Sequence, residues 1–591
     1  MHKNMKFVNI MLPGLLLLLL PASGSAAALT TRQETVRPLA IPPDTRQISP
    51  SNVCQYQLYG YSAWQLGPGV DEGRRFDLMP AGYRVATNQA QLVSFFSLSD
   101  IHITDKESPA QVPYFGWSGP FHGGGLFVSA YSPIMVSTTH VLDAAVRTVN
   151  ALHHQNPFNF GIVLGDVCNA SQYNELRWFL AVMDGQPIIP SSGDHSGADT
   201  IAYQKPYQAA GLDRSIPWYQ VIGNHDQFWM GVGYPTTKVR HTLVGRTVLN
   251  MGTNPLAPNV TEETGTYMGV IDGNTRFGDV IKGGPTNLFT TPPTVVADAD
   301  RRSLTTDAAS NALSCTNFMG EFFKTSSFPK GHGFQPANLE NNSACYTFEP
   351  LTNLPLKVIV LDDTCKRIGP SGGPMFYGGG WVDAPRYAWL TNELQKGQAA
   401  GQLMILACHV PINAQADLFV TNPAPQQFYV TPQKQSQPQF ADCKTDAELT
   451  AALHNYSNLI LVMAGHRHLN TVTPQPSPDP AHPEYGFWEV ETPSLRDFPQ
   501  QFRTWSLLRN SDNSISIVTT DVDPQVAAGS PAADSRGYAI GASRIFGNTA
   551  LADTTSHVYN AELLKPLSPA MQAKIAGYGA PLAAAELPLK K

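Results

Sequence analysis

Five short patches in this 591-residue chain contain Asp, Asn and His, whose side chains are of the types that can bind metal ions. In the central patch, Gly223-Asn224-His225-Asp226, an amide oxygen stands beside an ionisable imidazole. The other four patches are Asp100-Ile101-His102, Gly165-Asp166, Cys408-His409 and Gly465-His466-Arg467-His468. Carboxylate and amide oxygens together with imidazole nitrogens suit Mn, Fe, Zn or Co, and they suit a site based on soft sulfur poorly. The set therefore indicates metal-assisted hydrolysis at a pair of ions.

Each patch directly follows a short apolar run of the kind that forms a buried strand. These runs cover residues 92–98, 160–164, 218–222, 403–407 and 459–463. Amphipathic helices are expected between them, over 138–154, 173–183, 384–395 and 446–454, with a further strand at 356–361. Such alternation predicts layered α/β sheets, which bind ligands at the carboxyl ends of their strands.

The last third of the chain is expected to complete the fold. Residues 487–491 and 505–519 are interpreted as antiparallel strands of a second sheet, and a helix is expected near 561–575. Taken singly, each patch has an ordinary structural explanation, such as an Asx turn or a core histidine. The occurrence of five patches after five separate apolar runs favours a metal site.

The ordered patterns Asp-x-His, Gly-Asp, Gly-Asn-His-Asp, His and Gly-His-x-His resemble the calcineurin-like metallophosphoesterase superfamily, which includes the purple acid phosphatases. The resemblance covers roughly residues 92–520. It implies an α/β fold, a four-layer α-β-β-α sandwich of two mixed sheets with long insertions. It also implies hydrolysis of phosphoesters by a hydroxide that bridges two metal ions, each of them Mn, Fe, Zn or Co in a divalent or trivalent state.

The resemblance assigns a role to each matching residue. One metal would be held by Asp100, His102 and His468, the other by Asn224, His409 and His466, and both by Asp166. His225 would be the catalytic imidazole that binds no metal, with Asn169 orienting it. Purple acid phosphatases have Tyr where this chain has Asn169, so a tyrosinate ligand is not expected. Many other members have Asp there, and Asn169 cannot offset a positive charge on His225 as Asp would.

Composition limits the classes of partner. The formal net charge is −7 and charged residues make up 14% of the chain, while Gly and Pro number 48 each. This balance indicates a loop-rich globular enzyme. Because the sequence has no basic stripe to neutralise a phosphate backbone, no nucleic-acid partner is expected. The resemblance implies a small phosphoester as the substrate. The oligomeric state is left open.

The chain is divided into four parts. Residues 1–28 have Lys3 and Lys6, an apolar run at 7–20 and small residues at 23–28, which is typical of a secretory signal peptide. An uncleaved anchor is the alternative. Residues 29–90 are interpreted as a leader that wraps the core, 91–523 as the metallophosphoesterase domain with an insertion at 228–344, and 524–591 as a tail. A periplasmic or secreted protein is expected, with no stable membrane span once the signal is removed.

Seven cysteines would permit up to three disulfides in that setting. Cys168 and Cys408 adjoin expected strand ends and are predicted to be buried free thiols. The better candidates for pairing are Cys54, Cys315, Cys345, Cys365 and Cys443. Their connectivity cannot be deduced from the sequence.

Two other functions remain open at this stage. A nuclease or nucleotide diesterase could use the same metals, although the acidic balance does not favour it. A non-catalytic, metal-holding binding protein of the cell envelope is the other alternative. Such a protein would have no need for His225, which is not expected to bind metal. Neither phosphomonoesters nor phosphodiesters are favoured by the motifs.

Overall fold

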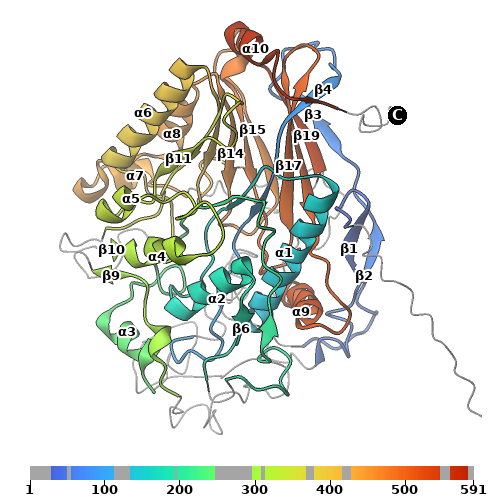
Figure 1. Ribbon diagram of the computed structural model, residues 1–591, viewed down its shortest axis with the longest axis vertical. Helices are drawn as coiled ribbons and strands as arrows, with labels where there is room; N and C mark the ends of the chain where they lie inside the picture. The colour runs from blue at the N-terminus through green and yellow to red at the C-terminus, as the bar shows by residue number, and fades with distance from the viewer. Residues whose placement is uncertain are drawn as a thin grey trace, which may run out of the picture.

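The computed structural model describes residues 28–48, 55–111, 133–193, 196–246, 296–307, 313–367, 378–414, 428–545 and 560–582. Cys54, most of the expected signal peptide and part of the expected insertion lie outside these residues. Two large mixed sheets organise the described residues, and helices accompany both of them (Figure 1). The chain therefore has a mixed α/β architecture.

The larger sheet has eight strands, and its centre is the long strand β4 (Asn88–Leu98). The strand order is β3 (Gly73–Arg75), β19 (Asn560–Lys565), β18 (Ile515–Val522), β17 (Phe502–Asn510), β4, β5 (Phe160–Val163) and β8 (Trp218–Gln220). The short strand β20 (Ala580–Pro581) also pairs with β4. Strands β4, β5 and β8 run parallel, so their carboxyl ends lie at one edge.

The smaller sheet has six strands, four of which run parallel. Its order is β11 (Tyr346–Phe348), β12 (Leu356–Val360), β13 (Leu403–Ala407), β14 (Leu459–Ala464), β16 (Phe487–Glu491) and β15 (Thr471–Gln475). The two outer strands, β11 and β15, are antiparallel to their neighbours. Strands β13 and β14 each end directly before one of the candidate patches.

The main helices are α1 (Thr138–Gln155), α2 (Tyr173–Asp184), α6 (Ala384–Ala400), α8 (Asp446–Leu453), α9 (Pro531–Ile545) and α10 (Pro569–Ile575). Their ends follow local sequence signals. Glu175 closes a capping box at the start of α2, and Glu448 does so at the start of α8. Left-handed glycines, Gly185 and Gly401, end α2 and α6.

Shorter elements complete the described chain. The short helices are α3 (Thr237–Val244), α4 (Thr316–Glu321), α5 (Pro336–Glu340) and α7 (Pro432–Gln435). The two-stranded ribbons are β1 (Glu34–Pro38) with β2 (Trp64–Pro68), β6 (Pro187–Ile188) with β7 (Tyr207–Gln208), and β9 (Thr306–Asp307) with β10 (Leu313–Ser314).

The two sheets share a hydrophobic core. Alternate residues of β12 face opposite ways: Val358 and Val360 pack in a cluster with residues of β4 and β5, whereas Ile359 packs in a second cluster with α6 and α8. At the sheet edges, Tyr219 of β8 stacks on Phe348 of β11 with ring centroids 3.5 Å apart. In Figure 1, α6 and α8 lie at the upper left and α1 and α9 at the lower right.

Two of the expected elements were wrong. Residues 505–519 form the hairpin of β17 and β18 in the eight-stranded sheet, because Asp512 and the left-handed Asn513 make a turn between them. Strand β16 lies in the other sheet, parallel to β14. Residues 560–565 form β19, which is buried beside β18, so tertiary pairing overrides the helix propensity of this segment. Only α10 is helical there.

The four described cysteines that were named as candidates for pairing form no disulfide, and all six cysteines in the part of the chain that the structure describes are buried. Each of the four candidates for pairing has a different polar contact. Cys315 donates to Gln227 Oε1 at 2.8 Å, and Cys345 Sγ accepts from Asp362 N at 3.3 Å. Cys365 and Cys443 contact Arg367 O and Asp442 Oδ1, each at 3.8 Å. The prediction of buried free thiols at Cys168 and Cys408 is confirmed.

Candidate metal centre

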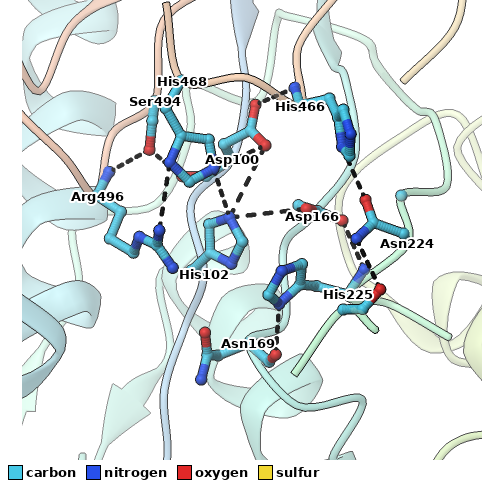
Figure 2. Close-up of polar contacts among 12 residues, drawn as sticks. Asp100, His102, Asp166, Asn169, Asn224, His225, His466, His468, Ser494 and Arg496 are labelled. Atoms are coloured by element: carbon cyan, nitrogen blue, oxygen red, sulfur yellow. Dashed lines mark hydrogen bonds and ion pairs between the residues drawn. The ribbon is translucent and has the colours of Figure 1, made fainter. Parts of the chain in front are cut away.

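The candidate residues lie on the turns that follow β4, β5, β8, β13 and β14. Five of them have positive φ angles between 49° and 78°: Asp100, His102, Asp166, His466 and His468. Residues other than glycine adopt this left-handed conformation at a cost, and such residues cluster at functional sites. The strained turns aim side chains from both sheets into one space (Figure 2).

The first cluster consists of Asp100, His102 and His468. The two Nε2 atoms of the histidines are 3.1 Å apart, and His468 Nε2 is 3.3 Å from Asp100 Oδ1. Ser99 Oγ and the His466 amide both donate to Asp100 Oδ2, which leaves Oδ1 directed at the histidines. Asp100 Oδ1 is buried and has no hydrogen-bond partner.

The second cluster consists of Asp166, His409 and His466, with Asn224 beside them. The Asn224 amide donates from Nδ2 to Gly231 O at 2.9 Å, which fixes its orientation. Its Oδ1 therefore faces His409 Nε2 at 2.9 Å and His466 Nδ1 at 3.0 Å. His409 donates its other ring proton from Nδ1 to Leu164 O at 2.8 Å, so its Nε2 is the nitrogen that faces the cluster.

Asp166 connects the two clusters. Its Oδ2 lies 3.7 Å from His102 Nε2 and 3.3 Å from His409 Nε2. Neighbouring ligand atoms bonded to one ion at roughly 2.0–2.1 Å are about 3.0–3.4 Å apart, which is close to the spacing within each cluster. Together with the unpartnered Asp100 Oδ1, this spacing fits two ions that share Asp166. The structure thus brings together all seven predicted ligands, and their ligation stays a prediction.

His225 lies next to both clusters, with a ring nitrogen within 4.8 Å of ligand atoms of His102 and Asp166. Its Nδ1 donates to the backbone carbonyl of Asn169 at 2.6 Å. The sequence-based expectation that the Asn169 side chain orients His225 therefore needs correction. That side chain instead reaches Gln111 at 3.4 Å, and its Oδ1 is buried without a partner. Any residue at 169 could supply the carbonyl that holds His225.

The histidines differ in charge because their surroundings differ. Burial lowers the pKa of His225 to about 4 and that of His466 to about 3. Although burial also disfavours a charge on His409, the neighbouring carboxylate of Asp166 raises its pKa to about 10. A protonated imidazole cannot ligate a metal, so an ion that enters the second cluster must displace a proton from His409.

Asp226, the last residue of the central patch, was given no role by the sequence interpretation. Its Oδ1 accepts from the amides of Val167 and Cys168 at 2.9 and 3.0 Å, and its Oδ2 accepts from those of Asp166 and Gly223 at 3.0 and 2.8 Å. The buried carboxylate therefore joins the turn after β5 to the turn after β8. The position of Asp226 in the motif was visible, but four backbone partners could not be inferred from sequence.

Asp497 is a second residue of the candidate site that the sequence interpretation missed. It lies on the turn after β16 and accepts a short hydrogen bond from His468 Nδ1. Although burial disfavours a charged imidazole, Asp497 raises the pKa of His468 to about 9. A carboxylate behind a ligating histidine fixes the ring and makes it more basic. Ser494-Leu495-Arg496-Asp497 also follows a buried strand closely, but that strand, β16, contains Glu489 and Glu491 and so lacks the apolar run that identified the other patches.

Gly231 packs against His225 and is expected to tolerate no side chain. Its φ is +74°, and a Cβ there would overlap His225 Nε2 and crowd the Asn224 amide. We expect Gly231→Ala to lower kcat/KM about 100-fold, the cost of a misplacement of roughly 1 Å near the reacting groups. Steady-state kinetics on a phosphoester, the substrate class expected from the sequence, would measure this. Gly197→Ala is the control, because Gly197 has a φ of +77° and no atom within 4 Å. Equal activity in the two variants would contradict the expectation.

No family model matches the sequence, and no curated protein matches it. Among solved structures, the fold is similar to a dimetal phosphatase from Danio rerio, with a TM-score of 0.32 and 10% sequence identity over 74% of this chain and 100% of that chain. The side chains that could bind metal in the described part of this chain are those of the two clusters, with His225 beside them.

Proposed function

We propose that this chain is a metal-dependent phosphoesterase that hydrolyses a small phosphomonoester or phosphodiester. The observation that carries the proposal is a pair of Asp, Asn and His clusters that share Asp166. Carboxylate, amide and imidazole donors at such spacing suit paired Mn, Fe, Zn or Co ions. Two ions bound about 3.5–4 Å apart activate water and neutralise phosphoryl charge in hydrolytic enzymes.

The roles of the side chains follow from their contacts. Asp100, His102 and His468 would hold one ion, Asn224, His409 and His466 the other, and Asp166 both. His225, with its Nδ1 proton held by Asn169 O, has Nε2 available for proton transfer. An anionic phosphoryl group beside this ring would raise its pKa from about 4, so that it could protonate the leaving oxygen.

The proposal extends to the architecture and location of the protein. The separate packing of the two faces of β12 supports a four-layer α-β-β-α arrangement. The basic start and apolar run at 7–20 support export to the periplasm or beyond. Within the described residues, no helix has the length and apolar character needed to cross a membrane.

The test is hydrolysis of a chromogenic panel of phosphomonoesters and phosphodiesters by metal-stripped protein resupplied with Mn, Fe, Zn or Co. We expect turnover only with metal. His225→Ala should lower turnover by about 10²- to 10⁴-fold, the usual contribution of general acid–base catalysis, while two metals per chain still bind. His241→Ala, at an exposed position on α3, is the control.

Each alternative function has its own outcome in this test. Cleavage restricted to nucleotide diesters or nucleic acids would favour the nuclease alternative over a small phosphoester substrate. Binding of two metals without turnover of any ester would favour a binding protein. Failure to bind metal would refute the proposed function.

A further inference from the structure

Arg496 is a buried arginine whose guanidinium is only partly used. The residue is 5% exposed, and its Nε donates to Asp497 Oδ2 at 2.8 Å. Its Nη1 is buried and has no hydrogen-bond partner. Its Nη2 lies 3.3 Å from His468 Nδ1, but that nitrogen already donates its proton to Asp497. At least one terminal N–H group of Arg496 is therefore left without an acceptor in the structure.

The guanidinium faces the candidate centre. Figure 2 shows it extending from the turn after β16 toward His102 and His468. Its Nη2 lies 3.3 Å from Nδ1 of His468, a residue of the first cluster. Arg496 is thus a cation beside the first cluster.

An unpaired buried donor costs free energy, and the cost is larger when the group is charged. The planar guanidinium presents its N–H groups in a geometry that matches phosphate oxygens. An oxyanion held between the two clusters and His225 would supply an acceptor for Nη1.

We propose that Arg496 is a substrate-binding residue that donates from Nη1 to a non-bridging oxygen of the phosphoryl group, while Asp497 holds the guanidinium in place. This inference rests on the proposed phosphoesterase function. It assigns Asp497 two tasks, because the same carboxylate oxygen accepts from His468 Nδ1 and from Arg496 Nε.

The competing explanation is an ordinary ion pair. Asp497 Oδ1 is also buried without a partner, so a small rotation could bring Nη1 onto it. Arg496 would then only neutralise Asp497 and support His468. In that case its loss would weaken metal binding and leave the affinity of the loaded protein for an oxyanion unchanged.

The two explanations are separated by titrating inorganic phosphate into the metal-loaded protein by calorimetry, with metal content measured by mass spectrometry. We expect Arg496→Met to keep two metals and to bind phosphate about 10- to 100-fold more weakly, the usual range for a hydrogen bond to a charged group. Arg496→Lys, which keeps the charge without the planar fork, should lie between. Arg147→Met, at an exposed position on α1, is the control.

The inference is overturned if phosphate affinity is unchanged in both Arg496 variants, whether or not their metal content falls. If Arg496→Met does not fold, the Arg496→Lys comparison decides. It is also overturned if the metal-loaded wild-type protein does not bind phosphate. Ester turnover by the wild-type protein tests the proposed function separately, since phosphate affinity can depend on Arg496 in a protein that cleaves no ester.

Discussion

Asp166→Asn is expected to remove metal from both clusters and to abolish turnover. Its Oδ2 lies 3.7 Å from His102 Nε2 and 3.3 Å from His409 Nε2, so one substitution affects both sets of ligands. Asparagine carries no negative charge to bridge two cations, and its amide nitrogen cannot bind them. Loss of a residue that only hydrogen-bonds to a metal ligand lowers metal affinity roughly 10- to 100-fold. Loss of Asp166 should lower it by more.

The measurement is metal content per chain after dialysis, together with ester turnover at saturating metal. Asp213→Asn is a suitable control, because Asp213 lies in a surface loop where it accepts hydrogen bonds from Ser215. Two metals per chain in Asp166→Asn at wild-type affinity would show that Asp166 does not bridge the ions. Loss of only one metal would assign Asp166 to a single cluster.

Asp226→Asn is expected to have the largest effect on stability. Each carboxylate oxygen of Asp226 accepts hydrogen bonds from two buried backbone amides. In the variant an NH₂ group replaces one of these oxygens, so two amides lose their acceptor in either orientation of the side chain. Two unpaired buried donors cost about 2–6 kcal/mol of unfolding free energy. Because those amides belong to the turns that carry Asp166 and His225, metal affinity should fall as well.

Urea denaturation of the metal-free protein would measure the change in unfolding free energy without a contribution from bound metal. Asp479→Asn is the matched control, because the Asp479 carboxylate accepts a hydrogen bond from the backbone amide of Ala481 in an exposed turn. If the two variants had the same urea midpoint, the turns after β5 and β8 would not need the Asp226 carboxylate to stay together.

The strand-end patches could be predicted because each depends on a local signal. An apolar run such as 403–407 marks a buried strand, and β13 begins and ends where that run does. The order of the patches then indicated which residues meet. Helices α1 and α8 were equally visible from their apolar spacing, and their bounds differ from the expected ones by one residue.

Features that depend on distant partners could not be predicted in this way. The segment 560–565 has the composition of a helix and becomes a strand only because β18 is there to pair with it. The contact between His225 and the Asn169 carbonyl involves the backbone, so side-chain identity gave no indication of it. The free state of Cys315 and Cys443 likewise depends on which groups surround each thiol in the folded core.

The eight-stranded sheet is completed by strands from late in the chain, so we expect the candidate metal centre to form late in folding. Strand β4, which ends just before Asp100, pairs on one side with β17, where Ser97 is opposite Arg503. Contacts between residues so far apart in sequence close slowly, because a long loop must be ordered first. We therefore expect Asp100 to be positioned only after β17 has been synthesised. Metal acquisition would be one of the last steps of maturation, and incomplete chains would not retain metal at a partly formed site.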